Sequence, residues 1–298
     1  MFQRAYLLLF LTTMFWGGNA IAGKLAVGKV SPMLLTSMRW GLALIILVTF
    51  ALPQIRRDFA KIRKHWLLLA GLGAIGFTAF NVSLYSALEY TSAINVVIEQ
   101  AGMPAIIFVA NFLIFRIAAS TQQVVGFFLT LAGVFIVASA GSLENLLTLS
   151  FNRGDIIMLF AITFYGGYTV ALRYKPQIHW QSLISVLALS AFVVSLPFSI
   201  WEYLAGNTIV PGVEGFTIAA YTAIFPAIVG QVLYIKGNEL IGSNRAGLFI
   251  NLVPIFGTLM AVVILREAIQ LYHLLALALV VGGIGLAESN KQPTLPST

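Results

Sequence analysis

The sequence predicts an all-α integral membrane protein in which ten transmembrane helices form two inverted five-helix repeats. Of its 298 residues, 59% are hydrophobic and 9% are charged, whereas a soluble domain carries about 25% charged residues. The apolar runs are long and continuous rather than alternating, which favours helices over a membrane β-barrel. Motifs of the first half also recur in the second half. The chain has no cysteine, which excludes a disulfide framework and a thiolate metal site.

Ten apolar segments are each long enough to cross a bilayer as a helix, which takes roughly 20 residues. We expect these spans at residues 5–27, 32–53, 66–88, 93–115, 122–141, 154–173, 180–201, 216–236, 243–265 and 270–288. The residues that remain suffice for loops and tails, so no separate soluble domain is expected. The tail, residues 289–298, contains Pro293 and Pro296 and is predicted to be disordered and cytoplasmic.

The two halves of the chain share a pattern of motifs. Phe15-Trp16-Gly17-Gly18 is echoed by Phe164-Tyr165-Gly166-Gly167, 149 residues later. At an offset of 150, four further residues recur in order, namely Glu89 as Glu239, Pro104 as Pro254, Arg116 as Arg266 and Gly133 as Gly283. Five spans are an odd number, so the second unit enters the membrane from the opposite side. We therefore predict repeats at residues 1–142 and 154–288, with a substrate site between them and transport by alternating access.

Orientation follows from the positions of lysine and arginine. With a cytoplasmic N-terminus, twelve of these 17 cations fall on the cytoplasmic side, four on the opposite side, and Arg39 lies inside a span. By the positive-inside rule both termini are cytoplasmic, and we expect the chain in a bacterial inner membrane. The net charge of +7 is scattered rather than gathered in a stripe, so the lipid bilayer, and not a nucleic acid, is the expected partner.

One alternative concerns the first segment. Arg4, an apolar stretch and Ala20-Ile21-Ala22 resemble a signal peptide with a small-residue cleavage site. The equivalent segment in the middle of the chain argues against this, because no signal peptide acts there.

The same residues resemble a known family. Trp16-Gly17-Gly18-Asn19 with Lys24, then Pro32 and Arg39, then Pro104, Arg116, Gln123, Gly126 and Gly133 resemble the EamA repeat of the drug/metabolite transporter superfamily. The second copy fits through Pro254, Arg266-Glu267 and Gly282-Gly283, whereas the first departs at Ile117, where a Glu often stands. Within the superfamily the chain looks most like the YddG-type bacterial amino-acid exporters. The resemblance implies ten helices, cytoplasmic termini and export of small metabolites.

No cofactor or metal is expected. Gly18 to Lys24 satisfies the first seven positions of a phosphate-binding P-loop, but Leu25 follows instead of Ser or Thr and no strand precedes it. Small residues that let helices pack closely, with Lys24 reaching the interface, are the favoured interpretation. His65, His179 and His273 lie in or near different connections, which disfavours a shared metal site.

Polar residues inside spans are costly and are therefore candidates for function. Many share a helix face at spacings of three or four, and such faces suit a cavity with aromatic walls and orienting amides. Interhelical hydrogen bonding without substrate contact is the alternative for each. The predicted substrate-binding residues are Trp16, Asn19, Asn81, Tyr85, Asn95, Glu99, Tyr165, Tyr168, Gln231, Tyr234, Arg245 and Asn251.

Glu99 is the acid that lies deepest in an apolar run, which makes it a candidate proton carrier or partner of a substrate ammonium. A structural pairing with Arg39 or Arg245 is the alternative, and for Arg39 itself a structural role is favoured. Pro104 and Pro254 each remove a backbone donor, which predicts kinks in mid-helix and candidate gate hinges at equivalent depths.

These observations predict a secondary active transporter that exports amino acids, aromatic or otherwise neutral, and similar small metabolites. Its partners are a small-molecule substrate and, as a candidate, protons; the oligomeric state is left open. The alternative within transport is proton-coupled export of cationic drugs. An intramembrane enzyme is disfavoured, because the sequence shows no His/Asp/Glu cluster and no Ser with a nearby base.

Overall fold

The computed structural model describes residues 2–100, 102–116, 121–144, 152–241, 249 and 252–289, and in this part of the chain every regular element is a helix. Six of these helical segments are long and apolar enough to cross a membrane: Arg4–Ala26, Pro32–Lys64, Trp66–Ala87, Arg153–Tyr174, Trp180–Leu204 and Val213–Tyr234. Shorter apolar helices cover Val124–Val137, Val253–Leu265 and Leu271–Gly283. The all-helical membrane fold is thus confirmed, and the count of ten spans stays a prediction.

The elements of the first half are α1 (Phe2–Ala26), α2 (Pro32–Lys64), α3 (Trp66–Gly73), η1 (Ala74–Ala79), α4 (Phe80–Ala87), α5 (Ala93–Gln100), α6 (Met103–Phe115) and α7 (Thr121–Ala138). Those of the second half are α9 (Arg153–Ala171), η2 (Leu172–Tyr174), α10 (Trp180–Leu204), α11 (Val213–Thr222), η3 (Ala223–Val229), α12 (Gly230–Ile241), α14 (Val253–Leu265) and α15 (Leu271–Ser289).

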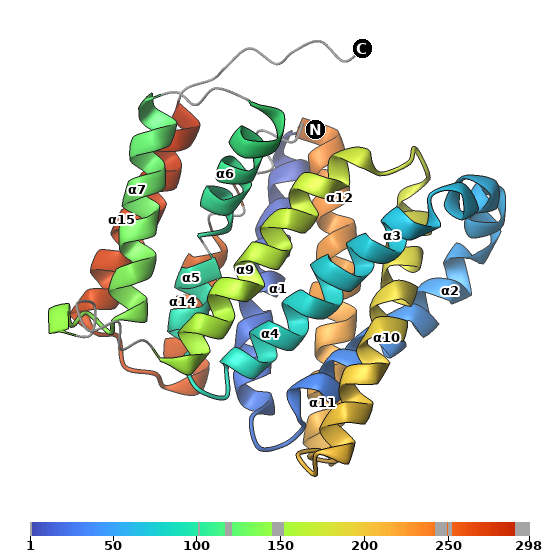
Figure 1. Cartoon of the computed structure of the whole chain (residues 1–298), viewed down its shortest axis with the longest axis horizontal. Coiled ribbons are helices and arrows are strands. Elements are labelled where there is room, and N and C mark those ends of the chain that lie inside the picture. The colour runs from blue at the N-terminus through green and yellow to red at the C-terminus, as the bar shows by residue number, and fades with distance from the viewer. Residues whose placement is uncertain are drawn as a thin grey trace.

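Helices of one half pack against helices of the other in pairs that the repeat relates. α1 packs against α12 and α14, and its counterpart α9 packs against α4 and α6. α2 packs against α10, and α7 against α15, so that these two pairs lie at opposite ends of the molecule with the remaining helices between them (Figure 1). The centre of the molecule is therefore built from both halves.

Two backbone irregularities also recur at the repeat offset. The π-helical turns η1 and η3 begin at Ala74 and Ala223, 149 residues apart. Arg116 and Arg266, which end α6 and α14, both adopt left-handed backbone conformations with φ of 54° and 57°. Because π-helical turns are rare and gather at functional sites, their matched positions direct attention to the middle of α3–α4 and of α11–α12.

Two predicted spans differ from the structure in their ends. α2 was expected to stop at residue 53 but continues for 33 residues to Lys64, with Pro53 inside it. The cationic segment assigned to a connection is therefore helical, and its Asp58 makes contacts described below. The expected span 93–115 is interrupted, because α5 ends at Gln100 and α6 begins at Met103.

Pro104 and Pro254 do not kink continuous helices in the described residues, so this part of the prediction was wrong. Pro104 is the second residue of α6, and Pro254 is the second residue of α14. A proline at the first turn of a helix removes no intrahelical bond. The two prolines thus mark equivalent helix starts, and their role as hinges stays a prediction.

α2 and α10 hold one another at both ends through buried acids. Glu202, near the end of α10, accepts hydrogen bonds from the hydroxyl of Ser31 at 2.7 Å and from two backbone N–H groups in the first turn of α2 at 3.0 and 3.2 Å. Asp58 of α2 accepts from the hydroxyl of Ser182 at 2.7 Å and from the backbone N–H of His179 at 3.0 Å, at the start of α10. Each acid satisfies orphan donors at the positive end of a helix dipole.

Candidate functional site

Three helices of the first half converge on a buried arginine. Arg39 of α2 is 5% exposed, and its Nη1 donates to the Oδ1 atom of Asn19 on α1 and to the hydroxyl of Tyr85 on α4, both at 2.5 Å. The Tyr85 hydroxyl in turn donates to the same Asn19 oxygen at 3.0 Å. The structure therefore brings together two of the predicted residues around an arginine for which the sequence favoured a structural role.

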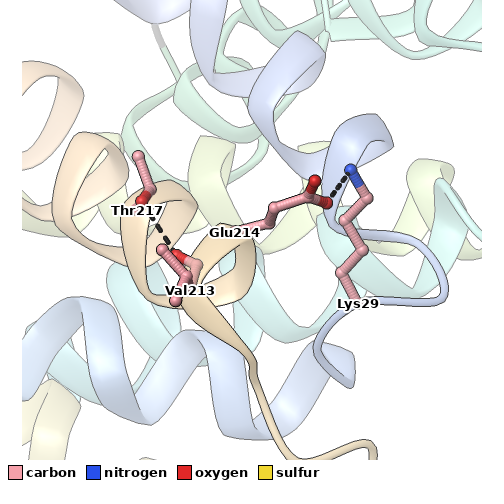
Figure 2. Close-up of polar contacts among 4 residues, drawn as sticks. All are labelled: Lys29, Val213, Glu214 and Thr217. Carbon is pink, nitrogen blue, oxygen red and sulfur yellow. Dashed lines mark hydrogen bonds and ion pairs between the residues drawn. The ribbon is translucent and has the colours of Figure 1, made fainter.

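The charge of Arg39 is not neutralised by an acid within the described residues. Its hydrogen-bond partners in that part of the chain are the neutral groups just named. The ring of Trp40 lies 5.2 Å from Cζ, and the Nε atom has no hydrogen-bond partner there. By contrast, Lys29 and Glu214 form an ion pair at 2.5 Å on the surface, where the turn after α1 meets α11 (Figure 2). A buried cation without a counter-ion is unfavourable, so the Arg39 site favours an anionic group.

Aromatic side chains from the second half lie close enough to this arginine to interact with its charge. The hydroxyl of Tyr165 on α9 interacts with Arg39, with Gln231 and with Tyr234 of α12. The ring of Tyr234 lies 5.2 Å from that of Trp16 on α1, whose indole N–H donates to a backbone carbonyl of η3 at 3.3 Å. Four predicted residues therefore line the centre between the halves.

Two glycines let further rings approach the same centre. A Cβ atom at Gly76, within η1, would lie 2.2 Å from ring atoms of Tyr168, whose ring centroid is 5.3 Å from that of Tyr165. A Cβ atom at Gly18 would lie 2.3 Å from the hydroxyl of Tyr221. The sequence interpretation missed Tyr221, although its spacing of four from Phe225 on one helix face offered a signal.

Asn81 contributes an unused acceptor one helical turn from Tyr85. Its Nδ2 atom donates to the carbonyl oxygen of Phe77 at 2.6 Å, whereas its buried Oδ1 atom has no hydrogen-bond partner in the described residues. This oxygen could therefore accept a hydrogen bond from an N–H or O–H group.

Asn95 and Glu99 belong to a second polar group at the start of α5. Asn95 bonds to Thr91 and to His273, while neither carboxylate oxygen of the fully buried Glu99 has a hydrogen-bond partner among the described residues. The alternative pairing of Glu99 with Arg39 is not present, since Arg39 bonds to Asn19 and Tyr85. Arg245 and Asn251 lie outside the described residues.

A family model matches both halves of the chain, and relatives along most of its length are named as transporters. A model described as the EamA-like transporter family matches residues 3–139 and again residues 152–288. The chain is 27% identical to the uncharacterized transporter YyaM of Bacillus subtilis, over 94% of this chain and 92% of that protein. It is 25% identical to an uncharacterized transporter of Archaeoglobus fulgidus, over 97% and 99% of the two chains. The fold is also similar to that of a solved structure described as a crystal structure of protein. The two structures have a TM-score of 0.65 and 20% sequence identity over 96% of each chain, and this similarity supports the fold alone.

Proposed function

Since this chain belongs to the EamA-like transporter family, we propose that it is a secondary active transporter that exports neutral amino acids, aromatic ones among them, and similar small metabolites. Its relatives are named as transporters, and its apolar helices make it a multi-pass membrane protein. The substrate class rests on the centre between the halves.

The observation that carries the substrate class is the buried Arg39, which has no counter-ion among the residues that the structure describes. Its guanidinium would pair with a substrate carboxylate, because charge-assisted bonds from arginine to carboxylate are strong and directional. The free acceptor of Asn81 would take the substrate amino group, and the rings of Tyr165 and Tyr168 would pack against its side chain. This arrangement suits a zwitterion with an apolar side chain.

Export of cationic drugs is the second candidate, and the aromatic walls suit it equally well. The uncompensated charge of Arg39 opposes it, since a second buried cation would be repelled. A competition assay with labelled substrate distinguishes the amino-acid exporter from the drug exporter. Neutral amino acids should displace labelled substrate from the reconstituted protein, and displacement by lipophilic cations alone would favour the drug exporter.

Alternating access follows from the inverted repeat, in which two nearly equivalent halves exchange roles around one site. We infer cytoplasmic termini in a bacterial inner membrane. Reporters fused after Lys64 and after Lys175 should both report the cytoplasm, because each position follows an even number of predicted spans. A cytoplasmic result at the first with an outside result at the second would contradict the five-plus-five repeat.

Uptake into proteoliposomes from a mixed pool of metabolites, with and without a pH gradient, tests the proposal directly. Alanine at Trp16, Tyr85, Tyr168 or Tyr234 should weaken transport and leave folding near normal. Alanine at Phe160, which is 58% exposed on the same helix as Tyr168, serves as the matched control. We expect no enzymatic turnover, and product formation by the purified protein without vesicles would overturn that expectation.

A further inference from the structure

The second polar group forms a strip along one face of α5. Asn95 and Glu99 are four residues apart on one face of α5, and Thr91, two residues before that helix begins, is joined to Asn95 by a hydrogen bond. The strip starts at the end of the molecule that the charge distribution assigns to the outside, and its helical part, from Ala93 to Glu99, extends about 9 Å inward at 1.5 Å per residue. It ends at Glu99, which is 0% exposed and has both carboxylate oxygens unpartnered among the described residues.

The outer part of the strip is a directed chain of hydrogen bonds. The Nδ1 atom of His273 accepts from the backbone N–H of Gln270 at 3.0 Å, so in the neutral ring Nε2 carries the proton and donates to Asn95 Oδ1 at 3.1 Å. Asn95 Nδ2 donates to Thr91 Oγ1 at 3.0 Å, and Thr91 Oγ1 donates to Asp155 Oδ1 at 2.6 Å. Each donor is directed toward Asp155, whose Oδ1 atom is therefore the acceptor at the end of the chain.

Other charged groups face the strip from the neighbouring helices. Lys24 of α1 donates to the backbone carbonyls of Leu88 and Thr91 at 2.9 and 2.7 Å. Glu267, just before α15, accepts from the backbone N–H groups of the first two residues of α5 and interacts with both Lys24 and His273. The helices α7 and α14, which also pack against α5, contain no titratable residue.

These contacts define the charge of Glu99 in this arrangement. The charged group that interacts with it is Asp155, and two buried negative charges without a shared cation repel one another strongly. Asp155 accepts a hydrogen bond from Thr91, whereas neither oxygen of Glu99 has a donor among the described residues, so a proton shared between the two acids is favoured on Glu99. Lys24 of α1 is engaged by two carbonyls and by Glu267.

We propose that Glu99 is a proton-binding site separate from the Arg39 site, and that protons reach it from the outer surface along the strip of Thr91 and Asn95. A proton from outside water forms an O–H bond with one carboxylate oxygen, and the same bond breaks when the proton is released to the cytoplasm. The strip joins α5 of the first half to α9 and α15 of the second, so a movement between the halves would change its access to water. Coupling of this proton to export rests on the proposed function, whereas the site and its access do not.

The access route can be tested without any substrate. The chain has no cysteine, so Asn95→Cys provides a single thiol on the strip, and Val96→Cys provides a matched thiol off the strip at a residue that is 0% exposed. A membrane-impermeant methanethiosulfonate reagent added to intact cells should modify Asn95→Cys and spare Val96→Cys. If the Asn95→Cys protein does not reach the membrane, Thr91→Cys, at the outer end of the strip, is tested in its place. Equal rates at both positions, or modification only in inverted vesicles, would overturn the route.

The proton site itself is tested by Glu99→Gln in proteoliposomes that hold a pH-sensitive dye and receive a mixture of labelled neutral amino acids. Glu99→Gln should lose substrate-driven proton movement and keep substrate exchange, while Glu214→Gln, which removes an acid exposed at the outer surface, should keep both. Proton movement by a folded Glu99→Gln protein would refute the site. If the unaltered protein moves no amino acid at all, the proposed substrate class fails, and the thiol experiment still decides the access route.

Discussion

Replacement of Arg39 by glutamine should weaken transport of carboxylate substrates selectively. A hydrogen bond to a charged group contributes about 1.5–3 kcal/mol, and each 1.4 kcal/mol corresponds to a factor of about ten in affinity. The half-saturating concentration of a neutral amino acid should therefore rise roughly 10- to 100-fold. Glutamine keeps a polar group beside Asn19 and Tyr85, so the change removes the charge with little change in packing.

The decisive measurement compares an amino acid with its decarboxylated amine in the same vesicles. The amine lacks the group that Arg39 is proposed to bind, so Arg39→Gln should leave its transport unchanged or improve it. Arg39→Lys keeps the charge and loses the planar fork, and should fall between the two proteins. Thermal unfolding in detergent controls for folding. Equal losses for the amino acid and the amine would refute the role of Arg39 in binding and assign it to structure.

Three further predictions concern the frame around the site. Glu202→Gln should lower the free energy of unfolding by about 1–3 kcal/mol, because it removes the charge from an acid that accepts three hydrogen bonds; thermal unfolding in detergent tests this, and an unchanged midpoint would contradict it. Gly76→Ala should reduce transport, because the added Cβ atom would lie 2.2 Å from the ring of Tyr168 and would displace it. Gly71→Ala, whose added Cβ atom would have no neighbour within 4 Å, should leave transport unchanged. Cysteines in place of Ser37 and Ser195, whose Oγ atoms are 2.8 Å apart, should form a disulfide that leaves transport intact; inhibition that a reductant reverses would show that α2 and α10 move apart.

Sequence patterns predicted the features that depend on composition and on spacing within one helix. Apolar length located most spans, and the offset between Gly17 and Gly166 anticipated equivalent packing in the two halves. Gly17 approaches the backbone of α14 at Gly257, and Gly166 approaches α6 at Ile106. Helix-face spacing likewise paired Tyr165 with Tyr168, whose rings do lie together.

Features that depend on contact between helices could not be predicted in this way. Residue spacing shows which side chains share a face of one helix, but it does not show which other helix packs against that face. The hydrogen bonds from Arg39 on α2 to Asn19 on α1 and Tyr85 on α4 were therefore not expected. His273 was assigned to an interface because it stands near a connection, yet it is buried and bonded to Asn95. The break between α5 and α6 was also missed, because apolar composition continues across it while the backbone pattern changes.

The Arg39 site and the strip that leads to Glu99 are both in contact with α1. α2 and α10 are joined at both ends by Glu202 and Asp58, whereas α5 is a short helix whose outer end is capped by Glu267. α1 contacts both groups, since Asn19 bonds to Arg39 and Lys24, little more than one turn further on, bonds to the carbonyl of Thr91. A substrate carboxylate that binds the Arg39 guanidinium would replace its hydrogen bond to Asn19 and could displace α1. Such a displacement would also change the outer end of the strip, where Lys24 bonds to Thr91. On the proposed function, substrate binding and proton access would therefore be linked through α1 rather than through direct contact between the two polar groups.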